Sequence, residues 1–383
     1  MASNPLLEVK EYGQSIWMDN LNRSLIKSGE LKEMIENRGL RGITSNPTIF
    51  EKAISGNKDY DADIEAGIKA GKSVPEIYES LIFADIRNAC DTFKAIYEES
   101  GGKDGYISIE VSPNLGRDTQ GTIEEARRFF QAIDRENVMI KIPGTPEGFP
   151  AVEQAISEGI NVNITLLFSV DSYLAAAEAY LRGLEARVAA GQPIDKIASV
   201  ASFFLSRIDT KVDERIEERL KQIGTENLNQ EARLNELKGK VAIANAKIAY
   251  HKFQEITSSE RWKNLAQKGA NVQRLLWAST STKNPEYSDV MYVDELVGSQ
   301  TVNTLPPKTI EACADHCDLA PNRVEMEVDK AYQTIESLKE PDININYNQV
   351  MDELLEEGID KFVQPFESLM QSLENKVKQL SPV

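Results

Sequence analysis

The sequence predicts an α/β fold in which eight parallel strands and the helices between them close into a (β/α)8 TIM barrel. Eight short apolar segments alternate with helical segments along the 383 residues. Consecutive parallel strands need a crossover, usually a helix, to join them. Eight such units fit within this length. An open doubly wound sheet is the alternative, but no Gly-x-Gly-x-x-Gly turn follows any of the segments.

The expected strands are short and rich in aliphatic residues, and the middle ones alternate apolar with polar side chains. They cover residues 15–19, 42–45, 107–113, 138–143, 161–166, 198–205, 274–279 and 301–306.

Helices are expected between the strands, where apolar residues recur at helical spacing. The first runs to residue 35 without a break, and Arg38-Gly39 closes it in the manner of a helix C-terminus. The later ones cover about 121–134, 148–158, 169–190, the stretch around Val212, 241–256 and 290–297.

Two further helical segments exceed what the connections of a barrel need. Residues 49–100 are predicted as a helical insertion before the third strand, divided by Gly71-Lys72-Ser73. Residues 320–383 are predicted as a C-terminal helical extension whose apolar face, including Phe362, packs on the barrel. The polar stretch 224–240 reads as another insertion. We expect residues 1–383 to form a single barrel domain that carries all of these segments.

The composition excludes several classes of protein. A net charge of -18 argues against nucleic-acid or anionic membrane partners, although a few gathered Lys or Arg residues could still bind a small anion. No apolar run approaches the roughly 20 residues of a membrane span. The N-terminus lacks the basic and apolar regions of a signal peptide. We therefore expect a cytoplasmic protein.

The cysteines predict neither disulfides nor a metal site. Cys90, Cys313 and Cys317 are too few and too scattered for a disulfide framework, which suits a reducing compartment. Cys313, His316 and Cys317 lack a fourth ligand at sensible spacing. No metal and no other cofactor is expected.

Lys141 stands in the middle of a short apolar strand, where a charged amine is costly to bury. That cost falls when the amine is neutral, and a neutral amine is the nucleophile that imine formation requires. A lysine whose head reaches the strand end or pairs with a carboxylate is the simpler interpretation. Taken alone, Lys141 favours the simpler one.

The flanking strands change that balance. Strand alternation places Glu110, Lys141, Asn163 and Thr165 on the polar faces of three consecutive strands, and in a barrel those faces point inward. Asp19 lies near the C-terminal end of the first strand, the end at which barrel active sites lie. A buried Lys141–Glu110 ion pair would explain one such strand. Three neighbouring strands that all carry such polar residues in register favour a catalytic site.

Imine formation between Lys141 and a substrate carbonyl fits this constellation. It needs one acid/base group for the carbinolamine protons and another to move a hydroxyl proton as a C–C bond breaks. Carboxyl groups and a hydroxyl from neighbouring strands supply both kinds of group.

Two motifs resemble the signatures of the transaldolase family. The segment GITSNPT at 42–48 is similar to its N-terminal signature, and MIKIPGT at 139–145 is similar to its Schiff-base lysine motif. Residues 161–166, 202–207 and 301–306 also resemble transaldolase strands. The resemblance runs from about residue 10 to 375 and is to the longer form of the family.

The resemblance implies a cofactor-free class I transferase of the non-oxidative pentose phosphate pathway. Such an enzyme moves a dihydroxyacetone unit from sedoheptulose 7-phosphate or fructose 6-phosphate to an aldose phosphate, glyceraldehyde 3-phosphate or erythrose 4-phosphate. Lys141 would form the imine, and Asp19 would shuttle the proton of the hydroxyl whose carbon is cleaved. Glu110 and Thr165 would hold the water that transfers protons.

The resemblance also implies the substrate-binding residues. Asn46 and Asn163 would hydrogen-bond the sugar hydroxyls, and Ser202 and Arg207 would bind the phosphate. Lys283 stands where the shorter forms of the family have an arginine, and lysine is a point charge instead of a bidentate fork.

Two other functions stay open at this stage. One is a fructose-6-phosphate aldolase-like lyase that releases free dihydroxyacetone. The other is a phosphosugar-binding barrel without catalysis. We expect phosphorylated sugars as partners and a monomer or homodimer as the assembly.

Overall fold

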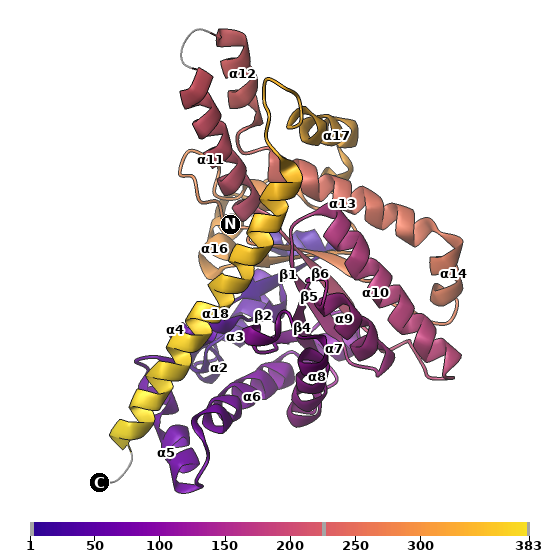
Figure 1. Ribbon diagram of the computed structural model, residues 1–383. Helices are drawn as coiled ribbons and strands as arrows, with labels where there is room; N and C mark the ends of the chain where they lie inside the picture. The colour runs from indigo at the N-terminus through magenta and orange to yellow at the C-terminus, as the bar shows by residue number, and fades with distance from the viewer. Residues whose placement is uncertain (1–3, 224–226, 381–383) are drawn as a thin grey trace.

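The computed structural model describes residues 4–223 and 227–380, and its centre is a closed barrel of eight parallel strands (Figure 1). Each strand pairs with the next in the sequence, and β8 pairs with β1. The strands are β1 (Gln14–Asp19), β2 (Leu40–Thr44), β3 (Ile107–Glu110), β4 (Val138–Pro143), β5 (Val162–Leu167), β6 (Ser199–Phe204), β7 (Arg274–Ala278) and β8 (Thr301–Leu305). The predicted barrel is confirmed, and the open sheet is wrong.

Helices surround the barrel. Those before β3 are α1 (Pro5–Glu8), α2 (Arg23–Lys27), α3 (Glu30–Arg38), α4 (Pro47–Ile54), α5 (Asp61–Lys69), α6 (Val74–Thr92) and α7 (Lys94–Glu99). Between β3 and β8 lie α8 (Thr119–Ile133), α9 (Gly148–Ser157), α10 (Val170–Ala189), α11 (Ser206–Ile223), α12 (Leu228–Leu237), α13 (Val241–Ser258), α14 (Glu260–Ala266) and α15 (Met291–Glu295). After β8 come α16 (Pro307–His316), α17 (Val328–Ser337) and α18 (Tyr347–Leu380). Single 3-10 turns cover Val9–Tyr12, Lys58–Tyr60, Pro113–Leu115 and Arg323–Glu325.

Glycines set two of the helix boundaries near the N-terminus. Gly39 ends α3 with a φ of 69°, a conformation that L side chains adopt at a cost, as the sequence predicts. The unbroken helix expected before it is wrong, because Gly29, with a φ of 85°, separates α2 from α3.

Four helices lie between β2 and β3, the region for which the sequence predicts an insertion. The insertion comprises α4 to α7, and α6 starts after Gly71 with a capping box in which Ser73 and Glu76 satisfy each other's backbone N–H groups. Of the polar stretch 224–240, residues 224–226 lie outside the described part, and most of the remainder forms α12.

One hydrophobic core joins the barrel to its helices. Its buried residues come from every strand and from helices as distant in sequence as α2 and α18; Trp17, Ile140 and Trp277 are fully buried in it. Complete burial of a side chain of this size stabilises the fold by about 1.5–3 kcal/mol. The continuous core therefore holds the strand ends, and any groups that they carry, in fixed positions.

The last helix, α18, has 34 residues and runs diagonally across the barrel (Figure 1, yellow). It packs against α4, α5, α6, α11 and β5 through an apolar face that includes the predicted Phe362 and Leu369, and Leu354 is also buried in it. Ion pairs hold it at both ends: Lys211 on α11 lies 2.9 Å from Glu353, and Lys376 lies 2.5 Å from Asp61. In the part of the chain that the structure describes, no strand follows β8 and no helix is long and apolar enough to cross a membrane.

Candidate active site

The strand pairing brings a lysine and a carboxyl group together inside the barrel. Glu110 of β3 is the register partner of Lys141 of β4, and Lys141 is the partner of Asn163 of β5. Lys141 is only 5% exposed; its Nζ donates a hydrogen bond of 2.9 Å to the Ser45 carbonyl and lies 3.6 Å from Glu110 Oε2. The predicted convergence of three strands is therefore present.

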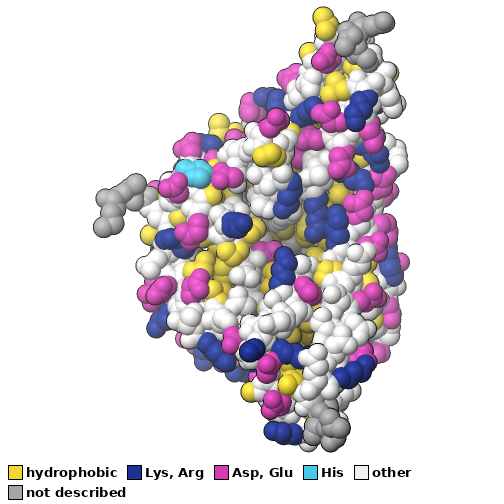
Figure 2. Space-filling model, turned by 90° about the vertical axis from the view of Figure 1, so that its left-hand side faces the viewer, with side chains coloured by type: hydrophobic (Ala, Val, Ile, Leu, Met, Phe, Trp, Pro, Cys, Tyr) yellow, Lys and Arg dark blue, Asp and Glu magenta, His cyan; other side chains and the backbone are white. Residues whose placement is uncertain are grey.

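A cavity of about 240 Å³ opens beside Lys141 at the C-terminal ends of the strands. On the face drawn in Figure 2, Lys and Arg side chains stand around a hollow near the middle, among scattered acidic ones. Seven of the nine residues that the sequence predicts for the site line the cavity: Asp19, Asn46, Lys141, Thr165, Ser202, Arg207 and Lys283.

The other two predicted residues adjoin these seven. Glu110 forms the ion pair with Lys141. Asn163 accepts a hydrogen bond of 2.7 Å from Ser202 and donates one of 3.0 Å to Ser108. All nine residues thus form one connected group.

Glu110 is a buried carboxyl group with the charged Lys141, Asp19 and Arg207 near it. Burial raises its pKa to about 7, while the nearby charge of Lys141 opposes the rise. Among the described residues, neither oxygen of Glu110 nor Thr165 Oγ1 has a hydrogen-bond partner. Both groups can therefore hydrogen-bond a small molecule, and the carboxyl group can exchange a proton with it.

Asp19 lies across the cavity in a different setting. One of its oxygens accepts a hydrogen bond of 2.8 Å from Thr44, whose hydroxyl also lies 2.7 Å from that of Thr304. The site thus contains one carboxyl group that accepts a hydrogen bond from a threonine and a second, buried one whose neighbour is the Lys141 amine.

Two cations stand at another side of the cavity. Burial lowers the pKa of Arg207, which the charges of Asp19, Glu110 and Glu357 oppose, and among the described residues its Nη1 has no hydrogen-bond partner. Burial and the neighbouring Arg207 lower the pKa of Lys283. Arg207 is the second residue of α11, so the N-terminus of that helix lies beside it. An anion bound here would offset the cost of burying the positive charges of Arg207 and Lys283.

Asn46 has a structural task as well. Its side-chain oxygen caps α4 by accepting a hydrogen bond of 3.0 Å from the Ile49 amide, and Pro47 follows as the first helical residue. This hydrogen bond fixes the Asn46 side chain, whose amide nitrogen can then act as a donor at the cavity.

Strand alternation fails at one position of β5. The sequence predicts Leu166 on the aliphatic face with Val162 and Ile164, but the pairing with β6 shifts register between Ile164 and Leu167. Leu166 has a φ of 60°, which is strained for this side chain. The Leu166 side chain packs closely against Gly358 of α18. A Cβ built on Gly358 would lie only 2.9 Å from Leu166 Cδ2, so the contact requires a residue without a side chain there.

Eight further residues line the cavity that the sequence reasoning did not assign to it: Thr44, Phe204, Ala278, Ser279, Ser281, Thr304, Pro306 and Phe362. Thr44 is the last residue of β2 and Thr304 is the last but one of β8, so a search for polar residues at the C-terminal ends of all the strands would have found both. Phe362 comes from α18, and no local pattern indicates which residue its ring meets.

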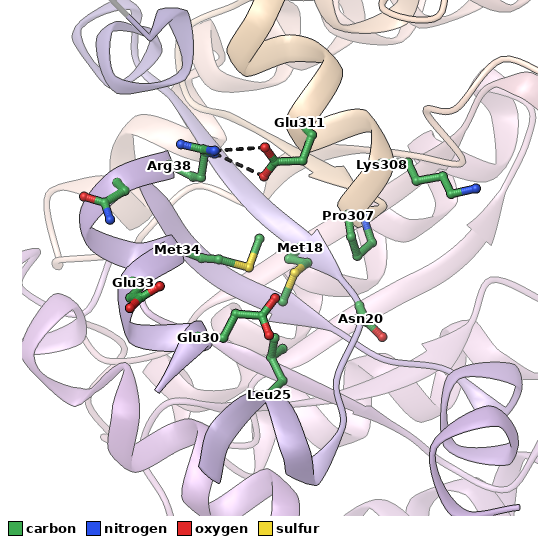
Figure 3. Close-up of a pocket in the computed structure, with 11 residues that line it drawn as sticks. Met18, Asn20, Leu25, Glu30, Glu33, Met34, Arg38, Pro307, Lys308 and Glu311 are labelled. Atoms are coloured by element: carbon green, nitrogen blue, oxygen red, sulfur yellow. Dashed lines mark hydrogen bonds and ion pairs between the residues drawn. The ribbon is translucent and has the colours of Figure 1, made fainter. Parts of the chain in front are cut away.

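A second cavity, of about 550 Å³, lies outside the barrel between α3 and α16 (Figure 3). Arg38 and Glu311 face each other across it in a bidentate ion pair, with N–O distances of 3.1 and 2.9 Å. Lys308 points away from the acidic side chains. None of the nine predicted site residues lines it.

The cysteine and histidine cluster is not arranged around a common centre. Cys313 and Cys317 are buried, whereas the exposed His316 binds Asp289 and Asp315. Within residues 4–223 and 227–380, no group of three or more His, Cys, Asp or Glu residues is placed to hold a metal ion.

A (β/α)8 barrel with a buried lysine beside a carboxyl group at the strand ends defines the class of enzymes that act through a lysine imine. Comparison with known proteins narrows the class. Residues 16–373 match the family model described as Transaldolase/Fructose-6-phosphate aldolase. The chain belongs to this family.

Relatives match over essentially the whole chain. It is 66% identical over 383 residues to "Transaldolase" of Trichodesmium erythraeum and 67% identical to "Transaldolase 2" of Nostoc sp., covering 100% of both chains in each case. It is 44% identical to "Transaldolase" of Saccharopolyspora erythraea, covering 99% of this chain and 100% of the relative.

Proposed function

We propose that the protein catalyses the transaldolase reaction, the transfer of a dihydroxyacetone unit from a ketose phosphate to an aldose phosphate, in the non-oxidative pentose phosphate pathway. The observation that carries the proposal is the buried Lys141, paired with Glu110, at a cavity that Arg207 and Lys283 also line. The full-length relatives named transaldolase support it.

In the proposed mechanism, Lys141 Nζ attacks the carbonyl carbon of the donor to give a carbinolamine. A water held by Glu110 and Thr165 relays the protons as water leaves and the imine forms. Asp19 then takes the proton of the hydroxyl on the carbon beyond the scissile bond. The bond breaks, the aldose phosphate leaves, and a three-carbon enamine stays on Lys141.

The transfer half of the reaction reverses these steps. The enamine carbon attacks the acceptor aldehyde, Asp19 returns its proton to the new hydroxyl, and hydrolysis of the imine frees Lys141. Asn46 and Asn163 would orient the sugar hydroxyls. Ser202, Arg207 and Lys283 would hold the phosphate, for which the two partly desolvated cations are suited.

Borohydride trapping tests the proposal directly. Borohydride added with fructose 6-phosphate should reduce the imine, and mass spectrometry should find a three-carbon adduct on the peptide that carries Lys141. The Lys141→Arg variant should give no adduct. An unmodified Lys141 peptide in the wild-type enzyme would overturn the mechanism and favour a binding barrel without catalysis.

The lyase is the competing activity, and kinetics separate it from the transferase. A transferase should consume fructose 6-phosphate quickly only when erythrose 4-phosphate is present as the acceptor. Full-rate cleavage without an acceptor would identify the lyase. The cytoplasmic location and the monomeric or homodimeric state stay predictions; sedimentation velocity would measure the latter.

A further inference from the structure

Helix α18 brings an aromatic ring to the lysine. Phe362 lines the same cavity as Lys141, is 5% exposed, and has its ring centroid 5.7 Å from Lys141 Nζ. It lies on a helix that is not part of the barrel, so its presence there needs a separate explanation.

The ring is held in place by the packing of α18. Gly358, one turn before Phe362, lets the helix approach Leu166, the strained residue that directly follows Thr165. On the other side, Lys211 of α11 binds both Glu353 and Glu357. Contacts with β5 and α11 therefore fix where the helix crosses the barrel mouth.

The ring adjoins the atom on which the enamine would form. An enamine has two fates: its carbon attacks an acceptor aldehyde, or the same carbon takes a proton from water. In the second case the resulting iminium adds water, Lys141 leaves as the amine, and free dihydroxyacetone is released. An apolar ring against the lysine displaces water from this region and slows the second fate.

We propose that Phe362 is a specificity-determining residue that shields the lysine-bound enamine from water and so directs the enzyme toward transfer. The proposal rests on the imine mechanism above and adds to it. Phe362 takes no proton and forms no bond; it acts by occupying space that water would fill.

The partition of the enamine tests this role. Purified Phe362→Ala enzyme is given fructose 6-phosphate with limiting erythrose 4-phosphate, and free dihydroxyacetone and sedoheptulose 7-phosphate are quantified. We expect the ratio of released to transferred product to rise by about tenfold or more over the wild type. Phe362→Met, which keeps an apolar side chain of similar length, should restore most of the wild-type ratio.

A matched control separates shielding from stability. Leu373→Ala removes a buried side chain from the same helix, at a residue that does not line the Lys141 cavity. Because both products come from one enamine, loss of folded enzyme lowers them together, and the ratio in this control should stay at the wild-type value. A wild-type ratio in Phe362→Ala, or an equal rise in Leu373→Ala, would overturn the proposal.

The outcome can be told apart from failure of the mechanism itself. If the wild-type enzyme gives no borohydride adduct on Lys141, the imine mechanism fails and no enamine exists to be partitioned. If the adduct forms in wild type and in Phe362→Ala but the ratio is unchanged, only the role of Phe362 is wrong. Should Phe362→Ala not fold, Phe362→Leu leaves a smaller gap and should show a smaller rise in the same ratio.

Discussion

Glu110 keeps its proton in the folded protein over a pH range in which the unfolded chain has lost it. Its pKa rises from 4.5 to about 7 because of burial, with Lys141 opposing. Between these two values the native state binds more protons, so the free energy of unfolding contributed by this group falls as pH rises, by up to about 1.4 kcal/mol per pH unit.

Urea unfolding at several pH values measures this effect. The difference in unfolding free energy between the wild type and Glu110→Gln should move in favour of the variant from pH 4.5 to about 7 and then level off. A difference that moves the other way would mean that Glu110 is ionised in the native state throughout.

The two carboxyl groups should govern different chemical steps. Glu110→Gln should slow imine formation and Asp19→Asn should slow C–C cleavage, each by about 10²–10⁴-fold, because each removes a general acid/base. Rapid-quench trapping measures the first step and release of the aldose phosphate measures the second. Impairment of the same step in both variants would contradict this division.

At the residue scale, local rules predicted the contacts that the strands make in register. Glu110, Lys141 and Asn163 are direct register partners, so alternation was sufficient to bring them together. The same rule failed at Leu166, because a bulge depends on what the strand packs against and not on its own sequence.

At the scale of elements, the turn from β4 into α9 is unusually tight. A Cβ on Gly148 would lie 2.0 Å from the Pro143 carbonyl oxygen, a backbone atom that cannot turn aside. Gly148→Ala should therefore destabilise the protein by about 3 kcal/mol or more. Gly116→Ala is the control, because its nearest contact, 3.4 Å, is ordinary. Equal thermal midpoints of the two variants would contradict this reading.

The periodicity of apolar residues predicted the types and the order of the elements. It did not predict where a helix is interrupted or which residues a helix contacts on the barrel. The apolar face of α18 was visible in the sequence. The contact between the Phe362 ring and Lys141 was not, because it depends on how α18 crosses the barrel, and the two residues lie more than two hundred positions apart in the sequence. Gly29 was equally visible, yet one glycine inside a helical pattern does not by itself establish a break.

For the whole molecule, we propose that the insertion, the barrel and the C-terminal helix form one domain. One continuous hydrophobic core contains residues from Leu6 to Leu373. A single calorimetric transition is therefore expected, with equal calorimetric and van't Hoff enthalpies. A separate low-temperature transition that disappears when α18 is deleted would show instead that the helix unfolds independently.

The position of α18 in the chain has a consequence for biosynthesis. Chain synthesis yields all eight strands before α18, and Lys376 then binds Asp61, which was made more than three hundred residues earlier. The strands that carry Lys141 and Glu110 are therefore all synthesised before the helix that brings Phe362 to them. Because one core joins α18 to the barrel, the active site would be complete only late in synthesis, once α18 has left the ribosome.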